Sequence, residues 1–339
     1  MRLLPAVCAG LGLLLAGCSA APAGSPSASA PAASEPVAIA TTTHLGSLLG
    51  DITQCAGATS ATLMGPGDDP HDFSVSSSQV AAMIKSGLVI SSGLGLEGGL
   101  TSVLDGVQRE GATVFEVAPR LDPLKFADIH TEREGERAED EHGHDDHADD
   151  DHEHTGADDG HHHGEYDPHV HMDAARMATA ATLIGAELAT KTGDQAYIGC
   201  AEQVAGKVRE ADAEVRRILS AIPEQNRVLV TDHEAYNYFA RAYGFTVAAV
   251  VIPGGSTDAE PSSAELASLV ETIKHDHIKV IFSNNTVSPR MMEALARESG
   301  TEVKIVELFE GSVGPQGSGA DTYTGMMITD AQRIADALK

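Results

Sequence analysis

Two runs of alternating strand and helix patterns constrain what this chain of 339 residues can fold into. Short runs rich in β-branched residues, such as 59–64 and 88–91, alternate with helical patterns such as 45–55. The alternation stops after the first third of the chain, resumes at 227–231 and continues to a last helix at 323–338. Strands that alternate with helices predict βαβ units and mainly parallel sheets. We therefore expect an α/β fold of two lobes, each with a mainly parallel sheet flanked by helices.

Between the two runs lies a segment that cannot form a core. From about residue 120 to 167 there is no hydrophobic periodicity, and residues 132–159 hold 14 acidic residues against two arginines, a net charge of −12. Such a segment is expected to be disordered without metal. Two long helices are predicted after it, at 172–190 and 194–222. The predicted domains are an N-terminal lobe at 37–190, a linker helix at 191–222 and a C-terminal lobe at 223–339.

The N-terminus has the pattern of a secretory signal. Met1-Arg2 precedes an apolar run that is too short to span a bilayer, and residues 15–18 read Leu-Ala-Gly-Cys. This ending is similar to a bacterial lipobox, so we expect a signal peptide at 1–17 and lipidation of Cys18. The alternative is an ordinary cleaved signal with an incidental cysteine. Residues 18–36 are mostly Ala, Pro, Ser and Gly and indicate a flexible tether. The mature protein is then expected outside the cytoplasm, anchored to the bacterial membrane by lipid.

Cysteine content and net charge indicate a possible disulfide and limit the kinds of partner that the protein can bind. Cys55 and Cys200 remain in the mature chain, and an oxidising location makes a disulfide between them possible. The alternative is two buried free thiols. The chain has a net charge of −28, which argues against nucleic acid as a partner.

Three motifs that lie far apart in the chain each offer a histidine. They are Gly-Asp-Asp-Pro-His71, Asp-Pro-His169 and Thr-Asp-His233-Glu-Ala-Tyr, and an acidic motif, Asp321-Thr-Tyr-Thr-Gly-Met-Met, follows near the C-terminus. His71 and His233 each follow a predicted strand, and ligands of open α/β sheets bind at the carboxyl ends of the strands. Three imidazoles and one carboxylate make a closed tetrahedral zinc site, which indicates binding and not catalysis.

These motifs, together with Gly93-Leu94-Gly95-Leu96-Glu97, resemble the zinc-binding receptors of bacterial ABC importers. This is the ZnuA-like and TroA-like group, often called cluster A-I, and the resemblance covers residues 37 to 339. It implies two lobes, a rigid linker helix and a metal held between the lobes by His71, His169, His233 and Asp321. The motif selects His169 over His171, and Glu310 is the main rival to Asp321. Where the family often carries a Glu after the strand at 279–282, this chain has Asn284 and Asn285.

The resemblance and the ligand types together predict a function. Zinc prefers imidazole while manganese prefers oxygen ligands, so a histidine at position 233 favours Zn²⁺. We expect a receptor, not an enzyme, that acts as a monomer and delivers Zn²⁺ to a membrane ABC permease and its ATPase. The affinity should fall as the pH drops through the ordinary range of histidine, near ~6.5. The alternatives are a manganese or iron receptor, an extracellular zinc hydrolase, and a zinc store.

The acidic segment contributes a second, weaker metal-binding prediction. Its imidazoles are free to bind metal at neutral pH, and its carboxylates attract cations. Its eight histidines are therefore auxiliary metal ligands: His142, His144, His147, His152, His154, His161, His162 and His163. The alternative is a solvated insertion with incidental metal affinity.

Overall fold

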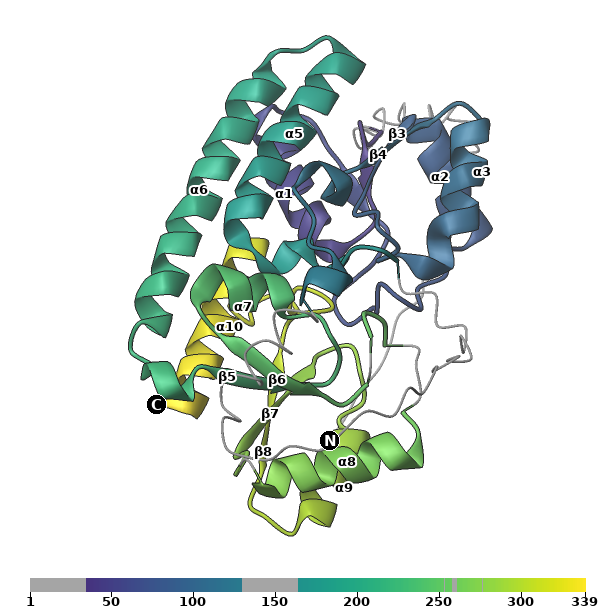
Figure 1. The fold of residues 1–339 in the computed structure, drawn as a ribbon. Helices are drawn as coiled ribbons and strands as arrows, with labels where there is room; N and C mark the ends of the chain where they lie inside the picture. The colour runs from purple at the N-terminus through teal and green to yellow at the C-terminus, as the bar shows by residue number, and fades with distance from the viewer. Residues whose placement is uncertain (1–34, 130–163, 253, 258–260, 276) are drawn as a thin grey trace, which may run out of the picture. The chain divides into compact units, whose positions relative to one another are not determined.

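Four parallel strands form a sheet in the first half of the chain, in the order β2-β1-β3-β4. The computed structural model describes residues 35–129, 164–252, 254–257, 261–275 and 277–339. Helices α2 and α3 cover one face of this sheet, and α1 and α5 cover the other (Figure 1). In chain order the elements are β1 (Ile39–Ala40), α1 (Thr43–Cys55), β2 (Ala61–Thr62), α2 (Ser77–Ser86), β3 (Leu88–Ser91), α3 (Thr101–Arg109), β4 (Thr113–Glu116) and α5 (Ala174–Thr192).

The second half repeats this plan with a sheet in the order β6-β5-β7-β8, again with every pair parallel. Helices α8 and α9 pack on one face of this sheet. The elements are α6 (Ala196–Leu219), β5 (Val228–Thr231), α7 (Asn237–Tyr243), β6 (Thr246–Val250), α8 (Ser263–His275), β7 (Val280–Asn284), α9 (Arg290–Ser299), β8 (Lys304–Leu308) and α10 (Tyr323–Leu338). The predicted α/β class, with two parallel sheets flanked by helices, is confirmed.

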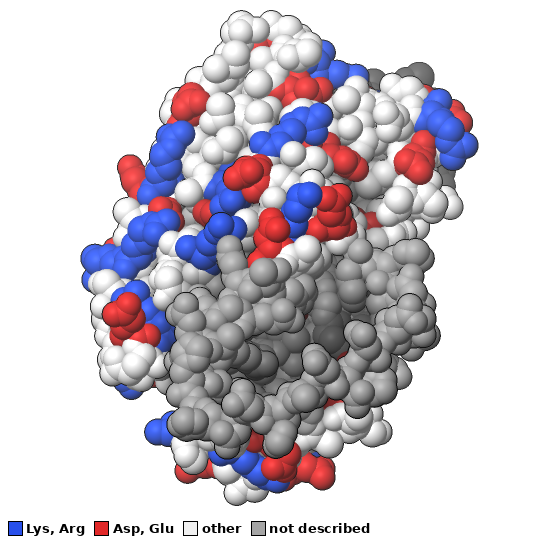
Figure 2. Space-filling view, viewed as in Figure 1, with Lys and Arg blue, Asp and Glu red and all other residues white. Residues whose placement is uncertain are grey.

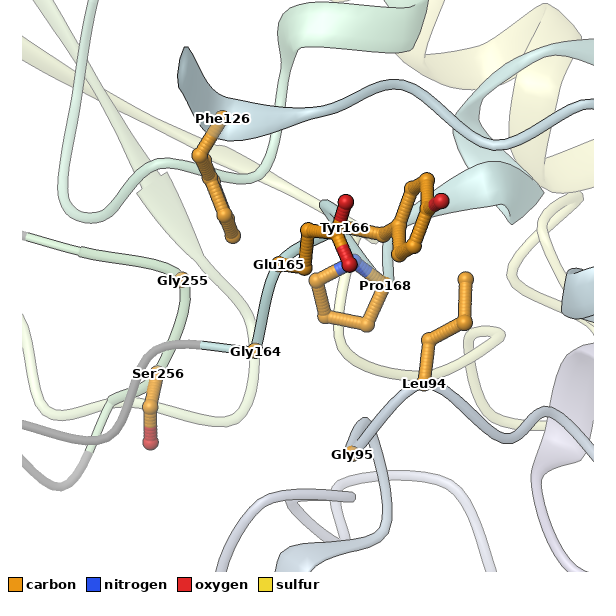
Figure 3. Close-up of a pocket in the computed structure, with 9 residues that line it drawn as sticks. All are labelled: Leu94, Gly95, Phe126, Gly164, Glu165, Tyr166, Pro168, Gly255 and Ser256. Carbon is orange, nitrogen blue, oxygen red and sulfur yellow. The ribbon is translucent and has the colours of Figure 1, made fainter.

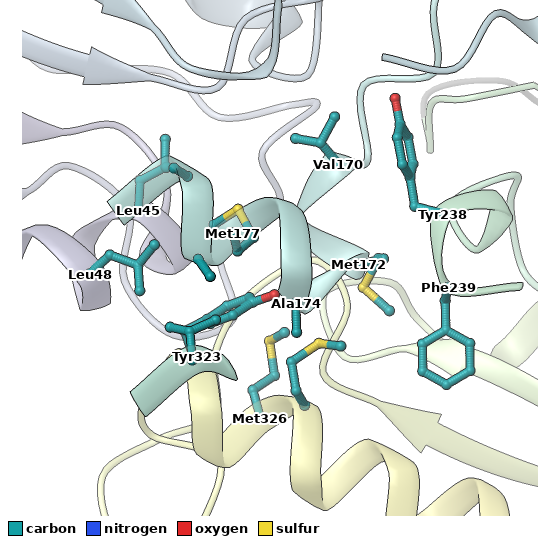
Figure 4. Packing of buried hydrophobic residues seen from close by; sticks show 14 of the residues in the cluster. Leu45, Leu48, Val170, Met172, Ala174, Met177, Tyr238, Phe239, Tyr323 and Met326 are labelled. Carbon is teal, nitrogen blue, oxygen red and sulfur yellow. The ribbon is translucent and has the colours of Figure 1, made fainter. Parts of the chain in front are cut away.

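A continuous hydrophobic core joins the two sheets. Its buried residues come from α1, α5, α6, α7 and α10, and Figure 4 shows Leu48, Met177, Tyr323 and Met326 meeting in it. Helix α6 packs against both α5 and α10, so it contacts elements of both halves. This position agrees with the expected linker helix, whose rigidity stays a prediction.

Local sequence signals explain where the helices begin and end. Ser76 and Gln79 form a capping box at the start of α2, and Gly87, with a φ of 68°, ends this helix in the left-handed conformation that glycine tolerates. Asp173 accepts hydrogen bonds from the N–H groups of Ala175 and Arg176 and so begins α5 directly after the His169 motif. These caps therefore fix the starts of α2 and α5, which follow the loops that carry His71 and His169.

The outer helices carry charges of both signs. On the face shown in Figure 2, Lys and Arg side chains alternate with Asp and Glu, and three ion pairs lie on α6: Arg209–Glu202, Arg216–Asp212 and Arg217–Glu214. Among the described residues, no helix is both long and apolar enough to cross a membrane. The predicted signal peptide, Cys18, nearly all of the tether and the segment 132–163 lie outside the described residues.

Candidate metal centre

His71, His169 and His233 converge between the two halves of the chain. All three are buried, and one ring nitrogen of each lies within 4.8 Å of those of the other two. His71 follows β2, His169 precedes α5 and His233 follows β5. The Nε2 atoms of His71 and His169 are 3.3 Å apart. Two ligands at about 2.05 Å from a tetrahedral zinc ion would be separated by roughly this distance.

Two buried carboxylates fix which nitrogen each ring presents to the centre. Asp167 Oδ1 lies 2.8 Å from His169 Nδ1, and Asp232 Oδ1 lies 3.1 Å from His233 Nδ1. Each carboxylate also accepts the backbone N–H of its own histidine. The Nδ1 atoms therefore carry the protons and Nε2 is left as the ligand, as in many metal sites. His233 Nε2 is buried and has no hydrogen-bond partner among the described residues, so it is available to a metal.

The carboxylate at this centre is Glu310 and not Asp321. Glu310 follows β8, is 1% exposed, and places its two oxygens 4.0 Å from His169 Nε2 and 3.7 Å from His233 Nε2. Asp321 is exposed and accepts a hydrogen bond from the N–H of Gly317 at 3.0 Å. The preference for Asp321 in the sequence analysis is therefore corrected. Its motif begins α10, because the Thr322 hydroxyl accepts the N–H of Gly325 and caps the helix.

Asn284 is a further residue of this centre that the sequence did not identify as functional. Its amide donates to Glu310 Oε2 at 2.9 Å, and its side-chain oxygen accepts the N–H of Gly311 at 3.0 Å. Its backbone N–H donates to Asp232 Oδ2 at 2.8 Å. Asn284, at the end of β7, thus links Glu310 to Asp232, the carboxylate that holds the ring of His233. The asparagines at 284 and 285, where the resembling family often has a Glu, were the signal for it.

Burial and neighbouring charges give the three histidines different proton affinities. Burial lowers the pKa of His71 to about 3 and that of His169 well below its ordinary value. Burial also lowers the pKa of His233, but the carboxylates of Asp232, Glu310 and Asp69 outweigh it and raise the value to about 9. The metal-free centre therefore holds one imidazolium, at His233, and two neutral imidazoles at neutral pH.

Metal binding is expected to release about one proton near pH 7, because only His233 must be deprotonated to become a ligand. Its pKa of about 9 means that a proton competes with the metal below that pH. The apparent affinity should therefore rise about tenfold per unit between pH 6 and 8 and level off above pH 9. This window lies above the ordinary histidine range expected from the sequence. Calorimetry in two buffers of different ionisation enthalpy measures the released proton, and an affinity that is constant between pH 6 and 8 would contradict this account.

A cavity of about 340 Å³ lies beside Pro168, the residue before His169. Figure 3 shows Leu94 and Gly95 of the first half on one side of it and Gly255 and Ser256 of the second half on another. Thr257, next to Ser256, donates its hydroxyl hydrogen to Asp69 Oδ2 at 2.8 Å. The loops that carry His71 and His169 are thus in contact with the second half at this point.

Cys55 and Cys200 form a disulfide that joins α1 to α6, with their Cα atoms 5.7 Å apart. Of the two alternatives left open by the sequence, the structure has the bonded pair. Their separation of 145 positions in the sequence makes a long loop, whose closure contributes about 5 kcal/mol in the chain-entropy treatment. The bond fixes the start of α6 to the first half of the chain.

Comparison with known proteins identifies relatives that match most of this chain. The family described as ZnuA, zinc-uptake complex component A periplasmic, matches residues 39–337. The manganese-binding lipoprotein MntA of Bacillus subtilis (strain 168) is 28% identical over 286 residues, which cover 82% of this chain and 82% of that protein. The zinc-binding protein TroA of Treponema pallidum (strain Nichols) is 27% identical over 288 residues, covering 81% and 80%. A solved structure of periplasmic zinc-binding protein TroA from Treponema pallidum has a TM-score of 0.71 at 25% identity and covers 90% of this chain and 99% of that one.

Proposed function

Because this chain belongs to the ZnuA family, we propose that it captures Zn²⁺ between its two halves and delivers it to the permease of an ABC importer. The match over 39–337 confirms the family resemblance found in the sequence. It also confirms the prediction of a metal-binding receptor and not an enzyme. A zinc hydrolase is therefore no longer an alternative.

The observation that carries the proposal is the convergence of three buried imidazoles on one point. The proposed ligands are Nε2 of His169 and His233, a ring nitrogen of His71, and one oxygen of Glu310. Three nitrogens and one oxygen match the tetrahedral preference of zinc, and four protein ligands leave no position for a reacting water. The centre is suited to holding a cation and not to catalysis.

Manganese is the second candidate cargo, and the relative MntA is named for binding it. Mn²⁺ prefers oxygen ligands and higher coordination numbers, whereas this centre offers mostly imidazole. Affinity at nitrogen sites also increases from manganese to zinc along the divalent series. The ligand chemistry therefore favours zinc.

Competition calorimetry tests the choice of metal. Zinc is expected to bind more tightly than manganese by on the order of 1000-fold, about 4 kcal/mol. Titrating zinc into protein saturated with manganese should therefore give nearly the same site occupancy as titration into metal-free protein. A manganese Kd equal to or below that of zinc would reassign the cargo to manganese.

We also propose where the protein is located and what its partners are. Lipidation at Cys18 would hold the receptor at the outer face of the membrane, beside the permease and its ATPase, and MntA is likewise named a lipoprotein. The eight histidines of 132–163 would act as auxiliary ligands that supply the centre. The receptor is proposed to act as a monomer.

A further inference from the structure

Two more histidines lie buried beside the proposed ligands. The rings of His44 and His171 stack with centroids 4.3 Å apart and an interplanar angle of 22°. Both ring nitrogens of His44 and Nδ1 of His171 are buried and have no hydrogen-bond partner among the described residues. A buried polar atom left unpaired costs about 1–3 kcal/mol, so an apolar pair would pack here at lower cost. The pair therefore calls for an explanation other than packing.

The ring of His171 contacts the carboxylate of the metal centre. His171 Nε2 lies 3.1 Å from Glu310 Oε1, on the opposite oxygen from the amide of Asn284 at 2.9 Å. Because a carboxylate only accepts hydrogen bonds, Nε2 of His171 must carry the proton. Each oxygen of Glu310 thus receives a donor, and the plane of the carboxylate is fixed between them.

We propose that His171, held in place by the stacked ring of His44, is a positioning residue that keeps Glu310 as a one-oxygen ligand and thereby favours zinc over manganese. The proposal rests on the proposed function, since it concerns the same centre. A tetrahedral zinc ion needs one oxygen from this side chain. Manganese prefers more oxygen ligands and would gain if both oxygens of Glu310, now 4.0 Å and 3.7 Å from the ring nitrogens of His169 and His233, moved to bonding distance of one ion. A donor on each oxygen opposes that shift of the carboxylate.

The contacts around His171 hold its ring in place, as a residue that positions Glu310 requires. The Tyr323 hydroxyl donates to the backbone carbonyl of His171 at 2.8 Å, and Asp173 begins α5 two residues later. His44 covers one face of the ring. Imidazole binds metal in the plane of the ring, so two stacked rings cannot direct their lone pairs at one ion. The stacked pair therefore supports Glu310 and is not a second chelating site.

The test compares two substitutions that keep the stacked aromatic pair. His171→Phe removes the donor to Glu310, whereas His44→Phe keeps it, and His171→Gln restores an N–H donor on a different side chain. Zinc and manganese Kd values are measured on each purified variant, together with the visible absorption of the cobalt-loaded protein. That absorption is intense for tetrahedral cobalt and weak for higher coordination. Thermal melting of each metal-free variant shows whether it is folded.

His171→Phe is expected to raise the zinc Kd about 10- to 100-fold, narrow the zinc-over-manganese preference about tenfold and weaken the cobalt absorption. His44→Phe should stay within about threefold of wild type, and His171→Gln should recover part of the loss. The proposal is overturned if folded His171→Phe matches His44→Phe in both Kd values and in the cobalt spectrum. If His171→Phe does not fold, His171→Leu takes its place, because leucine also lacks a donor to Glu310, and a folded His171→Leu that leaves the Kd ratio and the spectrum as in wild type overturns the proposal. A failure of the proposed function gives a different result. In that case the wild-type protein shows no zinc or cobalt binding that is lost in His233→Ala.

Discussion

Glu310→Ala is expected to weaken zinc binding by about 100-fold or more, on the order of 3 kcal/mol, while Asp321→Ala leaves the zinc Kd unchanged. Glu310 is buried beside the three histidines, and its removal takes away a carboxylate that lies 4.0 Å from Nε2 of His169 and 3.7 Å from Nε2 of His233. It also leaves the donors of His171 and Asn284 without a partner. Asp321 is exposed, and its carboxylate accepts the N–H of Gly317.

The two substitutions form a matched pair, since each removes one carboxylate from the C-terminal half of the chain. Calorimetry gives the Kd of each, and the zinc-induced rise in melting temperature gives an independent measure, because a ligand that binds only the folded state stabilises it according to its affinity. If Asp321→Ala lost zinc affinity and Glu310→Ala kept it, the ligand set drawn from the structure would be wrong.

The fourth proposed ligand shows where prediction from sequence motifs fails. Motifs singled out His71 and His233, and their positions after strands of a parallel sheet, where ligands gather, supported the expectation that they converge. Glu310 meets the same rule, two residues after the end of β8 at Leu308. Asp321 was preferred because its motif resembles the family pattern, but that motif serves to begin α10. The strand-end rule, applied throughout, would have selected the carboxylate that the structure places at the centre.

The fold itself was predictable because its signals are local. The βα alternation set the class, and β3 and α10 have the predicted ends, with Thr322 capping the start of α10. Contacts between distant segments were not predictable in this way. Whether Cys55 meets Cys200, or His171 reaches Glu310, depends on how α1 packs on α6 and how the two halves meet. Periodicity within one segment carries no information on such packing.

The central claim is that the described residues form one tight zinc site, and that this site does not depend on the histidine-rich segment 132–163. His233 is fully buried and its Nε2 has no hydrogen-bond partner among the described residues, so His233→Ala removes one of the four proposed ligands. The loss is expected to be about 1000-fold in Kd, on the order of 4 kcal/mol. His275→Ala, at an exposed histidine, is the matched control and should leave the Kd unchanged.

The measurement that tests this claim most directly is a calorimetric zinc titration of protein beginning at residue 37. It is made with and without residues 132–163, and with His233→Ala in each form. We expect one tight site that survives deletion of the segment and disappears with His233→Ala. Tight binding that disappears with residues 132–163 and persists in His233→Ala would contradict the account and make this protein a zinc store.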